Sequence, residues 1–224
     1  MNAAAARRAL VAVARRLDER GLVAGAEGNV SVRLDRDRIL VTPSQVPKHA
    51  LRVDDLVIVH LGAPKTRVAK SARGRVATRR ATSELALHTE IYAARPDVGA
   101  VVHAHPVCAT GFAIRRQAIP ANALAEVAGV IGPVPVVGYR RPGTTALGTA
   151  AAGALSRSQA RADVALLANH GAVAVGPSLD VALARMESLE QAAASVVAAR
   201  ILGGVRGLPD REVRWLAQAR KRRG

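Results

Sequence analysis

The sequence predicts an α/β fold of three layers, α/β/α, in which helices flank a mainly antiparallel central sheet. Two strand segments, residues 29–34 and 38–42, are separated only by a polar turn at residues 35–37, which is the spacing of a β-hairpin. Other strands and helices follow without the regular strand–helix–strand alternation of a parallel sheet. With 224 residues, half of them hydrophobic, the chain suits a single domain over residues 1–224 with one core.

The N-terminal segment is expected to form an amphipathic helix, because Leu10, Ala14 and Leu17 recur at helical spacing. Arg15 and Arg16 interrupt its apolar run, so we do not interpret it as a targeting peptide. Elsewhere no uncharged run approaches the roughly 20 apolar residues that a membrane span needs. We therefore expect a soluble protein that does not bind a membrane.

A basic connection is expected to lead from a strand at residues 56–61 to a second helix. Thr82 or Ser83 caps this helix, which runs through about Ala94 and ends before the turn at Pro96. The remaining strands are expected at residues 100–103, 134–138, 164–168 and 172–175. The remaining helices are expected at residues 108–115, 122–130, 142–155 and 178–202, with a basic tail helix at about residues 210–220.

The charge balance is strongly basic, with 33 lysine and arginine residues against 17 acidic ones and a formal net charge of +16. Such a balance favours polyanions or anionic small substrates. Aromatic residues make up only 2% of the chain and no nucleic-acid-binding motif appears, so we expect no specific nucleic-acid partner. The single cysteine, Cys108, cannot form an intramolecular disulfide, which favours a reducing, cytoplasmic location.

Two histidines, His103 and His105, stand at the end of a buried strand. Because strand side chains alternate, residues two apart project from the same face, so both imidazoles could share one metal ion. A packing or surface role is the alternative for an isolated pair of this kind.

A third histidine, His170, follows another apolar strand and lies between Asn169 and Gly171. Polar residues at a strand end are typical of loop-borne sites, and the glycine is expected to let the backbone turn. His170 is the natural third ligand, since three neutral imidazoles leave a coordination position open for substrate, as in catalytic zinc sites. The alternative is a histidine held by hydrogen bonds at the strand end.

Glu84 is expected in the first turn of the second helix, where the helix dipole favours a carboxylate whether or not it has a further role. His88 lies one turn further on, and we expect it to support the fold rather than bind a metal. The spacing of His49 and His60 suggests no partner, and we assign neither of them to a site.

Four motifs, in this order and spacing, together resemble the class II aldolase/adducin family over about residues 7–203. They are GNVSVRL at residues 28–34, ILVTPSQVPKHAL at 39–51, TSELALHTEIYAARPDVGAVVHAHP at 82–106 and LLANHGAVAVG at 166–176. Members of this family include fuculose-phosphate aldolase and ribulose-phosphate 4-epimerase. The resemblance implies a class II aldolase-like fold and a homotetramer with active sites at subunit interfaces.

The resemblance also implies that His103, His105 and His170 bind one divalent metal, with zinc expected and manganese or cobalt as alternatives. Glu84 would complete the metal shell or swing away to act as acid and base. The implied reaction is reversible aldol cleavage of a small ketose or ketose phosphate, which leaves a metal-stabilised enediolate. Epimerisation or dehydration of a sugar phosphate on the same metal is the alternative. A non-catalytic, adducin-like protein would be expected to lose the ligands.

Phosphate recognition in this family implies a further group of binding residues, which cradle a dianion with backbone amides and hydroxyls. These are Gly28, Asn29, Ser44, Thr82 and Ser83. The sequence departs from the pattern nearby, since Ala26 replaces a usual threonine or serine beside the acidic Glu27, and Gln45 replaces a usual glycine. These departures predict relaxed substrate use, with small hydroxycarbonyl compounds such as dihydroxyacetone or its phosphate as donors.

The proton donor differs as well. The fuculose-type tyrosine that a neighbouring subunit contributes is missing from the matching stretch, residues 122–126. Glu126 or Tyr139 could replace it if the fold places either of them near the site.

Overall fold

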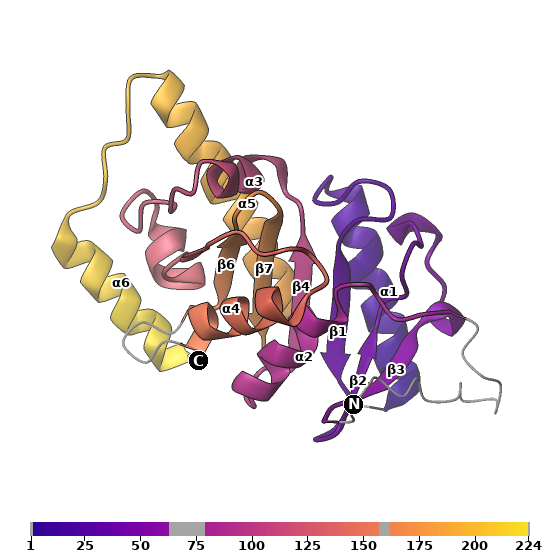
Figure 1. The fold of residues 1–224 in the computed structure, drawn as a ribbon. Coiled ribbons are helices and arrows are strands. Elements are labelled where there is room, and N and C mark those ends of the chain that lie inside the picture. Colours follow the sequence, from indigo (N-terminus) through magenta and orange to yellow (C-terminus); the bar gives the residue numbers. More distant parts are fainter. Residues whose placement is uncertain (1, 63–78, 157–161, 224) are drawn as a thin grey trace.

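The computed structural model describes residues 2–62, 79–156 and 162–223, and a seven-stranded sheet runs through this part of the chain (Figure 1). Its strands are β1 (Asn29–Arg33), β2 (Arg38–Val41), β3 (Val57–His60), β4 (Ala100–Ala104), β5 (Val136–Val137), β6 (Val164–Leu167) and β7 (Gly171–Gly176). The spatial order is β3-β2-β1-β4-β7-β6-β5. Only β5 and β6 pair in parallel, so the predicted mainly antiparallel sheet is confirmed.

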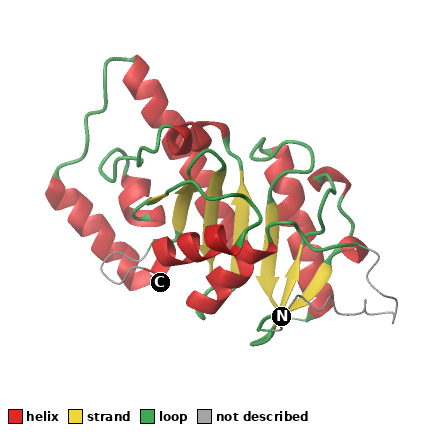
Figure 2. Ribbon diagram, in the orientation of Figure 1, coloured by secondary structure: helices red, strands yellow, loops and turns green. Residues whose placement is uncertain are grey.

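Helices cover both faces of this sheet, as the three-layer prediction requires (Figure 2). The helices are α1 (Ala3–Glu19), α2 (Leu85–Ala94), α3 (Val107–Ile114), α4 (Thr145–Ser156), α5 (Leu179–Ile201) and α6 (Asp210–Arg223). Shorter turns of helix are η1 (Lys48–Ala50), η2 (Val53–Asp55) and the π-helical η3 (Val127–Ile131). None of the described helices is long and apolar enough to cross a membrane.

Two hydrophobic cores lie on opposite faces of the sheet, one beneath α1, α3 and α5 and the other beneath α2 and α4. Alternation along β4 divides its side chains between them. Val102 packs into the first core and Val101 into the second. His103 therefore shares the face of Val101, which is the face that α2 covers. This places a buried imidazole and the start of α2 in the same layer of the molecule.

The helix expected at residues 122–130 differs from the prediction. A turn closed by the hydrogen bond from Ala123 N to the Pro120 carbonyl comes first, and the helical part lies at residues 125–131. Gly132 N then donates to the Val127 carbonyl over five residues, which makes this stretch a π-helix rather than an α-helix.

The predicted tail helix is present as α6, which begins at the expected Asp210 and extends to Arg223. It packs against η3 at the side of the molecule away from α1 (Figure 1). Arg220 Nη1 donates to the Ile131 carbonyl at 3.3 Å and contacts Asp163 Oδ2 at 3.2 Å. The basic connection expected after β3 falls largely at residues 63–78, outside the described residues.

Candidate metal centre and active site

His103 is fully buried near the end of β4. Its Nδ1 lies 2.9 Å from the carbonyl oxygen of Ala172 on the neighbouring strand β7. Because a carbonyl can only accept, Nδ1 is the donor and carries a hydrogen. Nε2, on the opposite side of the ring, lies 2.9 Å from Oε2 of Glu84. The sheet itself therefore orients this imidazole.

His105 lies just beyond the end of β4, and its backbone amide donates to the Leu22 carbonyl at 2.9 Å. Its Nε2 is 3.2 Å from His103 Nε2, and its Nδ1 is 2.9 Å from Oε2 of Glu27. The segment that follows is also anchored, since Glu190 of α5 accepts hydrogen bonds from the backbone amides of Cys108 and Ala109 at 2.9 and 2.8 Å. A carboxylate on the first amides of α3 stabilises the helix start next to His105.

His170 comes from the turn between β6 and β7, in which Leu167 pairs with Gly171 across a three-residue connection. The expectation that Gly171 lets the backbone turn was wrong. The left-handed residue is Asn169, with φ 56°. Gly171 is needed for space, because a Cβ there would lie 2.5 Å from the Ala104 carbonyl oxygen and 2.6 Å from the ring of His105.

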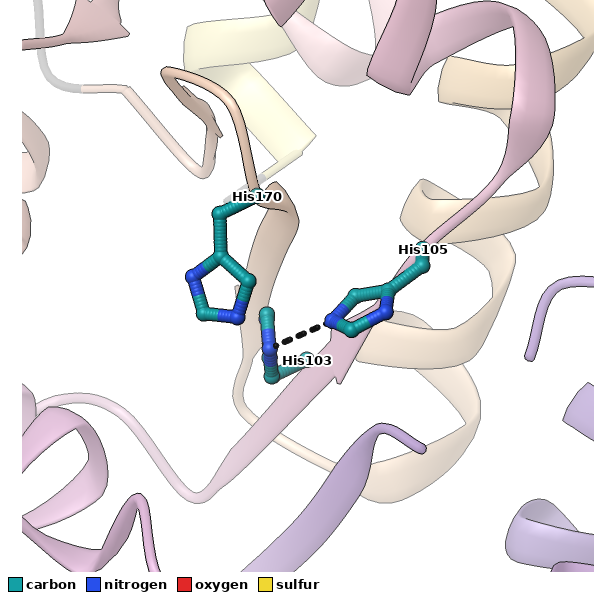
Figure 3. Close-up of side chains that lie close together, drawn as sticks. All are labelled: His103, His105 and His170. Atoms are coloured by element: carbon teal, nitrogen blue, oxygen red, sulfur yellow. Dashed lines mark hydrogen bonds between the residues drawn. The ribbon is translucent and has the colours of Figure 1, made fainter. Parts of the chain in front are cut away.

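The three imidazoles converge on one point, and Figure 3 shows their rings turned toward one another. One ring nitrogen from each of His103, His105 and His170 lies within 4.8 Å of the others. The ring centroids are 4.7 to 5.0 Å apart. This is the spacing at which three nitrogens can ligate a single ion.

Glu84 lies immediately before α2 rather than in its first turn, and its carboxylate faces the histidines. Of the two residues expected to cap this helix, Thr82 makes the bonds: its Oγ1 accepts from Glu84 N and its carbonyl from Leu85 N, both at 3.2 Å. Glu84 Oε2 accepts from Asn29 Nδ2 at 3.0 Å, and Oε1 lies 3.3 Å from His170 Nε2. The side chain is thus aimed into the site and not at the helix end.

The pKa of the Glu84 carboxyl reflects this position beside the histidines. Burial alone would raise the pKa of its carboxyl, but the hydrogen bond and charge of His103, the charge of His170 and the Asn29 amide together hold that pKa well below its ordinary value. Oε1 is buried and has no hydrogen-bond partner among the described residues. A buried carboxylate oxygen without a partner is costly, and a cation held by the adjacent imidazoles would satisfy it.

The histidines are suited to bind a cation. Burial, followed by the charge of His103, lowers the pKa of His105 and brings that of His170 to about 4. Both rings are therefore neutral near pH 7 and present a nitrogen lone pair. Together with the ring of His103 and the adjacent carboxylate of Glu84, they form a donor set that fits a divalent ion such as zinc.

His88 is buried away from the three converging imidazoles and joins a chain of hydrogen bonds that ends at Glu84. Its Nε2 bonds to Asn29 Oδ1, and its Nδ1 lies 2.7 Å from Ser31 Oγ, which in turn is 3.0 Å from Tyr92 Oη. Since Asn29 donates to Glu84 through its amide nitrogen, His88 Nε2 is the donor to the amide oxygen. Burial lowers the pKa of His88 to about 3, so the ring is neutral.

A cavity of about 280 Å³ opens beside the histidines. It brings together all the residues predicted to bind the substrate, and Glu84, His105 and His170 line it as well. The predicted residues are Gly28, Asn29, Ser44, Thr82 and Ser83. Gly28 fits because φ is 66° and a Cβ would lie 2.8 Å from the His103 carbonyl oxygen. Pro142 and Gly143 also line the cavity and were missed, because the sequence indicates only a helix start at that position.

The residues that depart from the family pattern face the same cavity. Ala26, Glu27 and Gln45 all line it, and Gln45 keeps the left-handed backbone, φ 58°, that a glycine would adopt without strain. Lys48, which sequence reasoning also missed, is buried beneath the two segments that carry Ala26 and Gln45. Its Nζ donates to the carbonyl oxygens of Ala26 at 3.0 Å and Val46 at 3.3 Å, and burial lowers its pKa to about 8.

Other residues considered from the sequence lie elsewhere. Neither Glu126 nor Tyr139 is among the described residues that line the cavity, and Tyr139 is half exposed. His49, in η1, lies 3.6 Å from Asp18 of α1, and His60 is exposed at the end of β3.

A family model for the class II aldolase and adducin N-terminal domain matches residues 8–197. The chain therefore belongs to the class II aldolase and adducin family, as the four motifs indicated. A solved L-fuculose 1-phosphate aldolase superposes with a TM-score of 0.85 at 29% identity, covering 99% of this chain and 98% of the other. The class II aldolase-like fold is thereby confirmed.

Relatives in this family catalyse different reactions. The chain is 34% identical over 190 residues to a 5-methylthioribulose-1-phosphate/5-deoxyribulose-1-phosphate aldolase of Rhodospirillum rubrum, covering 84% of this chain and 79% of that protein. It is 30% identical over 188 residues to a 3-oxo-tetronate 4-phosphate decarboxylase of Haemophilus influenzae, covering 82% and 83%. Both of these names specify a phosphorylated substrate.

Proposed function

We propose that this protein is a metal-dependent carbon–carbon lyase that cleaves a small ketose or ketose phosphate by a reversible aldol reaction. One observation carries the proposal: three imidazole nitrogens within 4.8 Å of one another stand next to the buried carboxylate of Glu84 at the wall of a cavity. Such a site combines a cation-binding cluster with an acid–base group.

His103, His105 and His170 would hold one divalent ion, which we propose to be zinc. When bound, the ion supplies Lewis-acid stabilisation of the negative charge that carbon–carbon cleavage leaves on the substrate oxygens. Glu84 moves the proton. Its position supports this role, because the Asn29 amide fixes one carboxylate oxygen while the other faces His170.

The far side of the cavity would bind the other end of the substrate. Asn29, Ser44, Thr82 and Ser83 present amide and hydroxyl groups there, which suit the oxygens of a phosphate or of a free sugar. The phosphorylated substrates named for the two relatives support a sugar phosphate. We also propose a homotetramer, which light scattering of the purified protein would test.

Metal analysis tests the first half of the proposal. Protein purified without chelator is expected to hold one divalent ion per chain, and alanine at His103 or His170 is expected to abolish binding. Substoichiometric metal that zinc, manganese or cobalt fails to restore would contradict the metal site.

A reaction screen tests the second half. Cleavage and condensation assays on matched free and phosphorylated ketoses, with product analysis for epimerised and dehydrated sugars, distinguish the lyase from an isomerase or dehydratase. Glu84→Gln is expected to lower turnover by about 10² to 10⁴ while the protein stays folded. Glu90→Gln, which replaces a glutamate within α2, serves as the control. Full activity in Glu84→Gln combined with lower thermal stability would reduce Glu84 to a structural residue.

A further inference from the structure

Glu27 is an acidic residue in a cavity that also presents the amide and hydroxyl groups proposed to bind an anion, and the proposed chemistry gives it no task. Its carboxylate does not project freely into the cavity, because Oε2 lies 2.9 Å from Nδ1 of His105. An ionised carboxylate can only accept a hydrogen bond, so Nδ1 of His105 is the donor. The contact therefore selects one tautomer of the ring.

That tautomer leaves the lone pair on Nε2, the nitrogen that faces the other histidines. His105 Nε2 lies 3.2 Å from His103 Nε2, at the point where the three rings converge. With the opposite tautomer, a hydrogen on Nε2 would occupy the position required for a ligand. A hydrogen on Nδ1 thus leaves the Nε2 lone pair of His105 available to a cation.

The three histidines differ in how they are oriented. His103 donates from Nδ1 to a backbone carbonyl, that of Ala172, which no substitution can remove. His170 Nδ1 is buried without a hydrogen-bond partner among the described residues. Within the described part of the chain, Glu27 is consequently the one side chain whose carboxylate orients a converging imidazole through Nδ1.

Contacts on both sides of Glu27 anchor the loop that carries it. Glu27 N donates to the Ala24 carbonyl at 3.0 Å, and the buried Lys48 holds the carbonyl oxygen of Ala26 at 3.0 Å. Gly28 packs against the end of β4, where a Cβ would lie 2.8 Å from the His103 carbonyl oxygen. These contacts hold the backbone of Glu27 beside the end of β4, within reach of His105.

From this geometry we infer that Glu27 is a positioning residue of the metal centre, which holds His105 in the tautomer and orientation that ligate a divalent cation. The inference rests on the proposed metal site. Carboxylates that orient metal-bound histidines typically contribute 10- to 100-fold in metal affinity. Half of the Glu27 side chain is exposed, so its replacement should leave the fold intact.

Zinc affinity, measured by competition with a chromogenic chelator, provides a readout independent of activity. Glu27→Ala is expected to weaken zinc binding by about 10- to 100-fold. Glu27→Gln keeps an oxygen that can accept from Nδ1 and is expected to lose less than Glu27→Ala. Glu19→Ala, at the exposed end of α1, should bind zinc like the wild type. Equal zinc affinity in wild type and Glu27→Ala would overturn the inference.

Nitrogen-15 NMR of the ion-free protein examines the tautomer directly. In the wild type, the His105 ring is expected to carry its hydrogen on Nδ1, and Glu27→Ala should shift it toward the other tautomer while the His103 signals change little. An unchanged His105 tautomer would also overturn the inference. A wild-type protein that binds no ion would instead remove the proposed function and, with it, the role of Glu27, so the two failures are distinguishable.

Discussion

Asn29 donates a 3.0 Å hydrogen bond from its side-chain amide to Oε2 of Glu84, which joins strand β1 to the residue that precedes α2. The amide oxygen of the same side chain accepts from the buried His88. Because an amide has a donor and an acceptor end, His88 fixes the orientation of Asn29, and Asn29 in turn fixes that of Glu84. The proposed acid–base group is therefore oriented from inside the protein.

This chain of hydrogen bonds predicts that His88→Gln lowers kcat by about tenfold or more with little change in KM. His88 does not line the cavity, so the effect must pass through Asn29 to Glu84, and small displacements of a catalytic group can be this costly. Tyr92→Phe, which removes the hydroxyl at the far end of the chain, should have the smaller effect. Steady-state kinetics on the identified substrate measures both. Unchanged turnover in His88→Gln, even with a lowered Tm, would show that His88 serves the fold alone.

The buried histidines predict how stability depends on pH. Burial lowers the pKa of His88 from 6.5 to about 3, so between these values the unfolded chain binds a proton that the folded protein does not. The free energy of unfolding should therefore fall as the pH decreases below 6.5, by at most about 1.4 kcal/mol per pH unit for this group. His170, whose pKa is also lowered by burial, acts in the same direction.

Urea unfolding of the ion-free protein at pH 7.0 and pH 5.5 measures this dependence. The midpoint should be lower at pH 5.5, and His88→Gln should show a smaller difference between the two conditions. A wild-type midpoint that rises on acidification would contradict the prediction.

The strained backbone at Gln45 predicts that Gln45→Gly stabilises the protein. Gln45 has φ 58°, a conformation that costs a residue with a Cβ roughly 1 kcal/mol and a glycine very little. Glycine also raises the entropy of the unfolded chain, so a net gain of about 0.5 kcal/mol or less is expected. Thermal unfolding measures it, with Gln117→Gly as the control at a glutamine whose own φ lies outside the left-handed region. A destabilised Gln45→Gly variant would show that the Gln45 side chain makes a compensating contact.

The missing hydroxyl at Ala26 predicts a modest preference for phosphorylated over free ketoses. Ala26 lines the cavity without a side-chain donor, and Glu27 beside it carries the same charge sign as a phosphate. Ala26→Thr is expected to raise kcat/KM for a phosphorylated ketose roughly tenfold and to leave that for the free ketose unchanged, since one hydrogen bond to a charged group contributes about 1.5 to 3 kcal/mol. A wild-type preference for the phosphate above about a thousandfold would mean that the pocket is already intact.

Features that depend on neighbouring residues could be predicted from the sequence. The alternation of β4 puts His103 and His105 on one side because side chains two residues apart on a strand share a face. The strand end that carries His170 indicated a third ligand, while the resemblance of the motifs supplied the role of Glu84 and the cavity residues. The predictions of helix starts and helix type were less exact. Glu84 lies before α2 and not in its first turn, and the stretch ending at Ile131 is a π-helix and not an α-helix.

Contacts between segments far apart in the chain could not be predicted in this way. Nothing in the pattern around Glu27 indicates that its carboxylate reaches His105, 78 residues away, or that Lys48 lies buried under the same loop. Pro142 and Gly143 enter the cavity because the segment before α4 packs against Ser83, whose carbonyl oxygen would lie 3.0 Å from a Cβ on Gly143.

The sequence by itself determined where most strands and helices form, because strand alternation, helix caps and turns are set by interactions between near neighbours, and its motifs indicated the candidate site residues. The tertiary structure decided how those side chains meet. The pairing of Ala104 with Ala172 across β4 and β7 sets the register that brings His170 to His103. Register, loop approach and burial are set by packing between distant segments, and it is this packing that gives Glu27, Asn29 and His88 their partners.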